Sequence, residues 1–305
     1  MPNHINEIRK NDFTWVSVSK PVKSALNQIG RQFNLRPEDV EACLPPLQRP
    51  KLIPGPNYLF MILLFPIFNR KTKEIESTEV DFFIGKNFLI TVHDNSLVPI
   101  RETFEEFEKS KNANAFSTGK ILTEVLDSLF KYCYPILIHI SQDIDNVEKR
   151  VFEIHNQKVT FEIMRLKTNV VEFKSNTALH NYVINKLITL GPNYFNGKRT
   201  YDRLNGLIED TKEIRASLDN NSETIYAIFD THQSLINLRA NQIMKNLQIF
   251  AVIVFPLTLL AAIFGMNTLG SMPFHSHPYG FWIIAAIMLC GTFAMLLFFK
   301  WRKWY

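Results

Sequence analysis

The strongest constraint on the fold of this chain is the absence of Lys, Arg, Asp and Glu between Lys245 and Lys300. Two apolar runs lie within that stretch, at 247–266 and 280–299, and each is long enough as a helix to cross about 30 Å of hydrocarbon. A domain of this size rarely buries two successive helices that are apolar on every side. The sequence therefore predicts two C-terminal transmembrane helices, at 247–267 and 280–299.

Basic side chains lie at the same end of both predicted spans. Arg239 and Lys245 precede the first span and Lys300 opens the basic tail at 300–305, whereas the outer loop at 268–279 contains no Lys or Arg. Basic residues are retained on the cytoplasmic side of membranes. We therefore expect a multi-pass protein in the lipid bilayer of the plasma (inner) membrane, with both termini cytoplasmic.

The first 135 residues alternate short strand and helix signals. Runs rich in β-branched and aromatic residues predict strands at 13–18, 58–65, 78–84 and 88–92. Apolar residues at helical spacing predict a helix between Val22 and Phe33, Pro37 favours the start of a second, and 101–109 predicts a third. We expect a cytoplasmic α/β domain over 1–135.

Long helices are predicted next, because Gly and Pro are absent from long stretches. The stretch 136–190 lies between Pro135 and Gly191 and predicts one very long helix or two stacked helices. Residues 219–222, Asp-Asn-Asn-Ser, predict a break, with Asn220 as a helix N-cap. A single helix can then run from about residue 221 to Phe264. We expect a helical stalk over 136–246 that leads into the first span.

Composition argues against several functional classes. The net charge is only +5 and the basic residues are scattered, so we expect no nucleic-acid partner. Cys43, Cys133 and Cys290 show no metal-ligand spacing and are expected to be reduced packing residues. No phosphate-binding loop, nucleophile elbow or zinc-hydrolase motif is present in the sequence, so we do not expect an enzyme. His93 is expected to be a structural or surface residue rather than a metal ligand. Three further histidines are expected to be surface or core residues: His139, His155 and His180.

A tripeptide, Gly265-Met266-Asn267, closes the first apolar run, and Pro256-Leu257-Thr258 lies in the middle of that run. With this placement, ahead of a second span and a basic tail, the chain resembles the CorA family of divalent-cation channels. The resemblance extends over the whole chain. It implies an α+β cytoplasmic domain followed by a long stalk helix and two C-terminal transmembrane helices, assembled as a funnel-shaped homo-oligomer, a homopentamer.

One face of the first span is predicted to line a pore. Two helices packed together leave no lumen, so conduction requires several copies of the hairpin. A polar side chain that faces lipid is costly and tends to face a cavity or another helix. One face of the helix holds the span's polar residues, Gln248 and Thr258. Spacings of three and four place eight residues on this face: Asn241, Met244, Leu247, Gln248, Ala251, Phe255, Thr258 and Ala262. Alternatively, these polar groups bond to neighbouring helices without lining a pore.

The outer end of that face is the predicted selectivity filter. Mg²⁺ gives up its water reluctantly, so an entrance should offer oxygen dipoles to the hydrated ion. A ring of Asn267 amides can do so, and the resemblance assigns the filter to Asn267 with Gly265 and Met266 as its support. The resemblance also places Met244 and Leu247 at an apolar constriction, where dewetting can gate the pore.

Regulation by cytoplasmic Mg²⁺ is a further implication of the resemblance. Family members of the magnesium type sense this ion through acidic residues between soluble domains, which closes the pentamer. Asp202 is the candidate that we place in this role. The other acidic side chains are interpreted as members of solvated helix faces.

Two positions depart from the family pattern. Phe255 stands where the family commonly has Met, which predicts a bulkier constriction. Phe274 follows Met-Pro in the outer loop, where family members often have an acidic residue. His275 and His277 come next, and two imidazoles could bind a softer metal such as zinc, cobalt or nickel.

Three functions remain open at this point. The leading hypothesis is a homopentameric channel for Mg²⁺ uptake, with an Asn-ring filter and gating by cytoplasmic Mg²⁺. The first alternative is a Zn²⁺ or Co²⁺ transporter of the same fold, which can be proton-coupled. The second is a non-conducting scaffold anchored in the membrane by the hairpin.

Overall fold

The computed structural model describes residues 5–10, 12–110, 117–153, 157–266, 273 and 277–302. The chain divides into two compact units, Met1–Phe229 and Asp230–Tyr305. The first unit contains a sheet with helices on both faces, and the second contains two apolar helical segments.

The first unit is built on a six-stranded sheet with the strand order β1-β2-β6-β5-β4-β3. Its strands are β1 (Ile5–Lys10), β2 (Phe13–Ser19), β3 (Lys51–Pro54), β4 (Tyr58–Asn69), β5 (Glu74–Gly85) and β6 (Phe88–His93). β2 and β6 pair in parallel, and the other neighbours pair antiparallel. The predictions at 13–18, 58–65, 78–84 and 88–92 are confirmed as β2, β4, β5 and β6.

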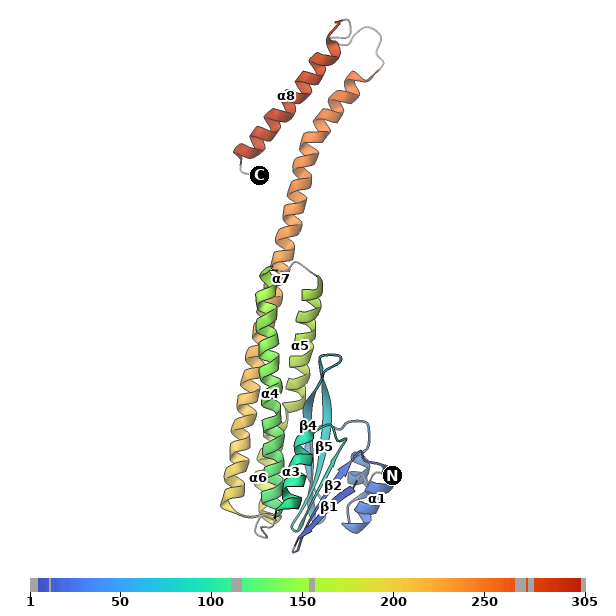
Figure 1. Cartoon of the computed structure of the whole chain (residues 1–305), viewed down its shortest axis with the longest axis vertical. Coiled ribbons are helices and arrows are strands. Elements are labelled where there is room, and N and C mark those ends of the chain that lie inside the picture. The colour runs from blue at the N-terminus through green and yellow to red at the C-terminus, as the bar shows by residue number, and fades with distance from the viewer. Residues whose placement is uncertain are drawn as a thin grey trace. The chain divides into compact units, whose positions relative to one another are not determined.

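Two short helices, α1 (Lys23–Gln32) and α2 (Pro37–Ala42), cover one face of the sheet (Figure 1). Side chains alternate along a strand, so every second strand residue points to this face. These residues form a buried cluster with the helices, which includes Val16, Val18, Leu26, Ile29, Val40, Cys43, Tyr58, Phe60, Ile62, Phe83, Ile90 and Val92. The helices approach closely, because a Cβ atom at Gly30 would lie 3.0 Å from a methyl carbon of Val40.

Longer helices cover the opposite face. They are α3 (Val98–Lys109), α4 (Thr118–Glu153), α5 (Gln157–Thr177) and α6 (His180–Leu190), and a short 3₁₀ turn, Gly191–Asn193, follows. The indole of Trp15 in β2 packs against two rings of α3, with centroid distances of 4.8 Å to Phe104 and 5.9 Å to Phe107. On β4, the ring of Phe65 lies 5.9 Å from that of Phe130 in α4. Aromatic packing therefore joins the sheet to the helical layer.

Pro135 lies inside α4 rather than ending a helix, so this part of the prediction is wrong. Proline removes one backbone donor and crowds the preceding turn. Buried side chains at helical spacing on both sides of it offset that cost, among them Leu122, Leu126, Leu129, Ile136, Ile140 and Ile144. The stretch 136–190 is accordingly divided among the end of α4, α5 and α6.

Residues 219–222 do not break a helix, and Asn220 is not an N-cap, because α7 runs without interruption from Lys198 to Phe264. The Asn221 side chain is buried, and its amide donates to the Ser141 hydroxyl at 3.0 Å. This tertiary contact uses the polar group that would otherwise compete with the helix backbone. The predicted end of the helix at Phe264 is confirmed.

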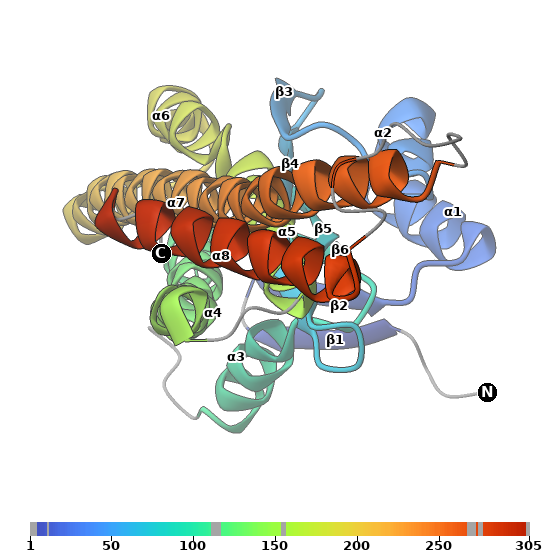
Figure 2. The ribbon, with the colours of Figure 1, turned by 90° about the horizontal axis from the view of Figure 1, so that it is seen from above.

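The second unit contains the C-terminal part of α7 and α8 (Gly280–Trp301). These two segments run antiparallel and side by side in both views (Figures 1 and 2). Pro256 lies within α7 without ending it. Both α7 and α8 are long and apolar enough to cross a membrane.

Candidate functional site

The predicted pore-lining residues all lie on α7 and share one face of it. The eight positions from Asn241 to Ala262 fall within an arc of about 120° at 3.6 residues per turn. Gly265 and Met266 project within the same arc when the helix is continued to them. We call this arc the α7 face; it consists of Asn241, Met244, Leu247, Gln248, Ala251, Phe255, Thr258, Ala262, Gly265 and Met266.

Nine of the ten residues of the α7 face are exposed in the single chain, and Ala251 is partly buried. Met244, Leu247 and Phe255 have 52%, 62% and 71% of their surface exposed. The better-buried residues of this segment lie mainly on the other side of the helix: Ile249 is buried, and Ile253, Pro256, Leu257, Leu260 and Phe264 are partly buried. The unit therefore packs through the opposite side of α7 and leaves the α7 face available to another molecule.

Two polar side chains lie within the span on the α7 face. The Thr258 hydroxyl donates to the Val254 carbonyl of the same helix at 2.8 Å, so its proton is already used. Such bonding to the preceding turn satisfies a hydroxyl in an apolar environment. Gln248 is exposed and carries both donors and an acceptor on its amide. Gln248 is thus the principal polar group of the span on this face.

The end of α7 has little room for a side chain at Gly265. Its N–H donates to the Ala261 carbonyl at 2.9 Å, and a Cβ atom at this position would lie 3.0 Å from that oxygen. The Met266 N–H donates to the Ile263 carbonyl at 3.2 Å, as in a tightened last turn. Asn267 and His275 lie outside the described residues.

The remaining metal-ligand candidates stand apart from one another. Asp202 is exposed near the start of α7. His277 is exposed, and its Nδ1 accepts the Tyr279 N–H at 3.2 Å. Within the ranges that the structure describes, no group of three His, Cys, Asp or Glu side chains is placed to hold a metal ion. The described part of the chain thus brings neither candidate together with further ligands.

Two of the four histidines expected to be surface, structural or core residues are buried and hydrogen-bonded. His180 Nε2 donates to the Leu64 carbonyl at 2.7 Å, and His93 Nδ1 accepts the Asn95 N–H at 3.1 Å. Because Nδ1 of His93 is an acceptor, its Nε2 carries the proton and donates to the Ser17 hydroxyl at 3.2 Å. Burial lowers the pKa of each histidine to about 4. His139 is exposed, and its Nδ1 lies 3.6 Å from Asp143 Oδ2. His155 is outside the described residues.

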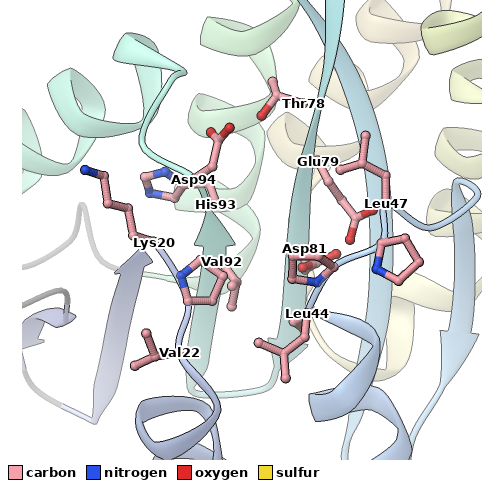
Figure 3. Close-up of a pocket in the computed structure, with 14 residues that line it drawn as sticks. Lys20, Val22, Leu44, Leu47, Thr78, Glu79, Asp81, Val92, His93 and Asp94 are labelled. Carbon is pink, nitrogen blue, oxygen red and sulfur yellow. The ribbon is translucent and has the colours of Figure 1, made fainter.

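Sequence reasoning missed one cluster, the carboxyl pair Glu79 and Asp81 on β5. The two groups line a cavity of about 360 Å³ in the first unit (Figure 3). Residues i and i+2 of a strand point to the same side, so the Glu-Val-Asp sequence within a predicted strand was the available signal. This cavity is far in sequence from the α7 face.

Comparison with known proteins gives a consistent picture. A family model described as CorA-like Mg²⁺ transporter protein matches residues 10–302. The Cobalt/magnesium transport protein CorA of Thermotoga maritima is 25% identical over 297 residues, which cover 95% of this chain and 83% of that protein. The protein of the same name from Methanocaldococcus jannaschii is 22% identical, with 98% of this chain and 94% of that protein covered.

The fold is similar to that of a solved structure. The complete structure of the CorA magnesium transporter from Methanocaldococcus jannaschii matches with a TM-score of 0.85 at 20% identity. The match covers 98% of this chain and 94% of that one. At this identity the likeness concerns the fold. It confirms the predicted order of an N-terminal α/β part, a long helix and a second apolar helix.

Proposed function

The chain belongs to the CorA-like Mg²⁺ transporter family, and we propose that it forms a homopentameric channel for Mg²⁺ uptake. As a family member it is a membrane transporter of divalent cations. The named relatives transport magnesium and cobalt, so Co²⁺ is the second proposed substrate. The proposal specifies three features: a pentameric assembly, a selectivity filter and an apolar gate.

The observation that carries the proposal is the position of the α7 face relative to the packed side of the helix. Ile249 and most of the partly buried side chains lie away from it, while Met244, Leu247 and Phe255 remain more than half exposed. One hairpin encloses no lumen. Copies arranged around a symmetry axis can bring their α7 faces together and line a shared path with them.

A ring of Asn267 amides is the proposed filter. Hydrated Mg²⁺ favours oxygen ligands that leave much of its water in place. The crowding at Gly265 supports this assignment, because a side chain there would displace the Ala261 carbonyl just before the filter. Met266 completes the proposed support of the ring.

The proposed gate is an apolar constriction on the α7 face. Met244 and Leu247 are exposed apolar side chains one turn apart. An apolar ring narrow enough to expel water blocks ions without a mechanical plug. Phe255 lies two turns further along and adds bulk to the same path.

Regulation and orientation complete the proposal. Asp202 is an exposed carboxylate near the start of α7, and we assign it to a site for cytoplasmic Mg²⁺ that closes the pore when neighbouring subunits contribute further ligands. The basic residues at 239, 245 and 300 favour cytoplasmic termini and a plasma-membrane location.

Cation flux into liposomes that contain the purified full-length protein tests the function. We expect saturable Mg²⁺ and Co²⁺ uptake without a pH gradient. Asn267→Ala should reduce Mg²⁺ flux or its selectivity over Co²⁺ and Ni²⁺. The control is Asn246→Ala, since Asn246 lies about 160° from the centre of the α7 face.

Four results would contradict the proposal. Uptake of Zn²⁺ alone, driven by a pH gradient, would favour the proton-coupled alternative. Absence of flux from a well-folded protein would favour the scaffold. Equal effects of Asn267→Ala and Asn246→Ala on cation flux would contradict the assignment of Asn267 to the filter. Cross-linking of Met244→Cys subunits in the bilayer should yield ladders up to five subunits, and lone subunits would exclude the shared pore.

A further inference from the structure

The cavity beside β5 lies on the sheet face that α1 and α2 cover. Its floor includes Glu79, Asp81 and Val92, and chain segments 20–22 and 43–47 form its walls. Figure 3 shows both carboxyl groups projecting from one strand into the space. Its volume of about 360 Å³ falls at the small end of the range for ligand sites in proteins.

The carboxyl pair has unused hydrogen-bonding capacity. Asp81 is 3% exposed, and among the described residues its Oδ1 has no hydrogen-bond partner. Glu79 accepts the Gln48 N–H through Oε2. Within the same described part of the chain, neither carboxyl group is in an ion pair. A buried acceptor without a partner is costly and marks a position where a donor can bind.

Like charges and burial act together on the pair. Burial first, and then the neighbouring Glu79 carboxyl, holds the pKa of Asp81 well above its ordinary value, and burial raises the pKa of Glu79. Two adjacent carboxyl groups cannot easily both ionise, so the empty cavity favours a retained proton. A bound cation can replace that proton and allow both groups to ionise.

The walls of the cavity are largely apolar. Leu44, Pro45, Pro46 and Leu47 form one side of the lining. Leu47 is 55% exposed and Val22 is 47% exposed, so both lie near the cavity mouth. Figure 3 draws the Lys20 side chain directed away from the carboxyl pair, so this ammonium group does not neutralise it.

We propose that this cavity binds a small organic cation, a primary ammonium group attached to a compact apolar body. The ammonium supplies three donors, which suit Asp81 Oδ1 and the remaining oxygens of the pair. The apolar body occupies the space between Leu44, Leu47 and Val92. A hydrated divalent ion suits the cavity less well, because it would place its water shell against apolar walls.

Calorimetric titration of the detergent-solubilised full-length protein tests the proposal, with cyclohexylammonium chloride as the probe. Cyclohexanol is the neutral analogue and MgCl₂ is the competing cation. We expect the ammonium probe to bind, cyclohexanol to bind far more weakly, and MgCl₂ not to displace the probe at equal concentration.

Variants locate the site. Glu79→Gln and Asp81→Asn should each weaken binding by about tenfold or more, the effect of losing a charge-assisted hydrogen bond. Glu74→Gln is the matched control, because Glu74 is an exposed carboxylate on the same strand. Leu47→Trp should block the mouth while leaving both carboxyl groups intact, so the proposal stays testable if a buried variant fails to fold.

The outcomes separate clearly. Loss of binding in Glu79→Gln, Asp81→Asn and Leu47→Trp, with binding kept in Glu74→Gln, supports the proposal. Equal binding of cyclohexanol, wild-type affinity in all three cavity variants, or displacement of the probe by equimolar MgCl₂ would overturn it. The readout is binding, so it does not depend on whether the protein conducts Mg²⁺.

Discussion

Asn221 of α7 and Ser141 of α4 exchange hydrogen bonds through their side chains. The Asn221 amide donates to the Ser141 oxygen at 3.0 Å, and the Ser141 hydroxyl lies 3.2 Å from the Asn221 carbonyl oxygen. Asn221 is 6% exposed. The Ser141 hydroxyl also lies 3.1 Å from the Leu137 carbonyl of its own helix, so Ser141 has a partner without α7. The buried Asn221 amide bonds to Ser141 only when the two helices meet in one register, so Asn221 specifies how α7 packs against α4 in the first unit.

Asn221→Ala should destabilise the first unit by about 1 kcal/mol, because it removes a buried hydrogen-bonded pair and leaves the Ser141 hydroxyl with fewer partners. The matched control is Asn220→Ala, since Asn220 is exposed on the neighbouring position of the helix and its replacement should change stability by less than about 0.5 kcal/mol. Thermal unfolding followed by circular dichroism measures both. Equal shifts in the two variants would show that the pair contributes nothing specific.

The buried histidines predict that acid weakens the first unit. His93 and His180 have folded-state pKa values of about 4, below the ordinary value of about 6.5. As pH falls through 6.5 the unfolded chain therefore binds protons that the folded chain does not. Above pH 6.5 the buried neutral histidines make their full contribution to the free energy of unfolding. This contribution is lost as pH falls towards 4, by up to about 3 kcal/mol for each histidine.

A variant isolates the contribution of His180. Gln at this position can still donate to the Leu64 carbonyl but does not titrate, so His180→Gln should show a shallower loss of unfolding temperature between pH 6.5 and pH 4.5. Between pH 7.5 and pH 9 the two profiles should run parallel, since the histidine is neutral in both states there. Parallel profiles over the acidic range as well would contradict the prediction.

The carboxyl pair on β5 predicts that stability depends on pH in the opposite direction. The folded-state pKa of Asp81 is raised, so the folded chain keeps a proton that the unfolded chain has lost, and stability from this group falls as pH rises through that window. Asp81→Asn should therefore stabilise the protein at pH 8 relative to the wild type, because the unfolded chain no longer gains by ionising this group. The gain should shrink as pH falls below about 4, where the aspartate becomes protonated in the unfolded chain as well as in the folded one. Glu74→Gln should show no such pH-dependent gain.

Much of the architecture could be predicted because its signals are local. β4 and β5 are rich in apolar and aromatic residues, and the long uncharged stretch in the second unit identifies α8 and the end of α7 without reference to anything else. The edge strand β1 has the sequence Ile-Asn-Glu-Ile-Arg-Lys. It pairs on one side only, so its charged side chains remain in water and its pattern is weak.

The features that could not be predicted depend on contacts between distant residues. Pro135 is tolerated in α4 because buried side chains on both sides of it hold the helix in place. Asn221 stays helical because Ser141, 80 positions away, satisfies its amide. The cavity forms only when the segment at 43–47 folds over Glu79 and Asp81. Propensity and periodicity contain no information on such partners.

Two phenylalanines of α7 allow the pore proposal to be tested with the same substitution on two sides of one helix. Phe255 lies on the α7 face and is 71% exposed, and Phe250 is 66% exposed but lies about 140° away around the helix. If the α7 faces surround a pore, Phe255→Ala removes bulk from the conducting path and should raise Mg²⁺ flux into liposomes several-fold. Phe250→Ala should leave the flux near that of the wild type, because its ring faces lipid or another part of the hairpin. A larger effect at Phe250 than at Phe255 would mean that a different face of α7 lines the path.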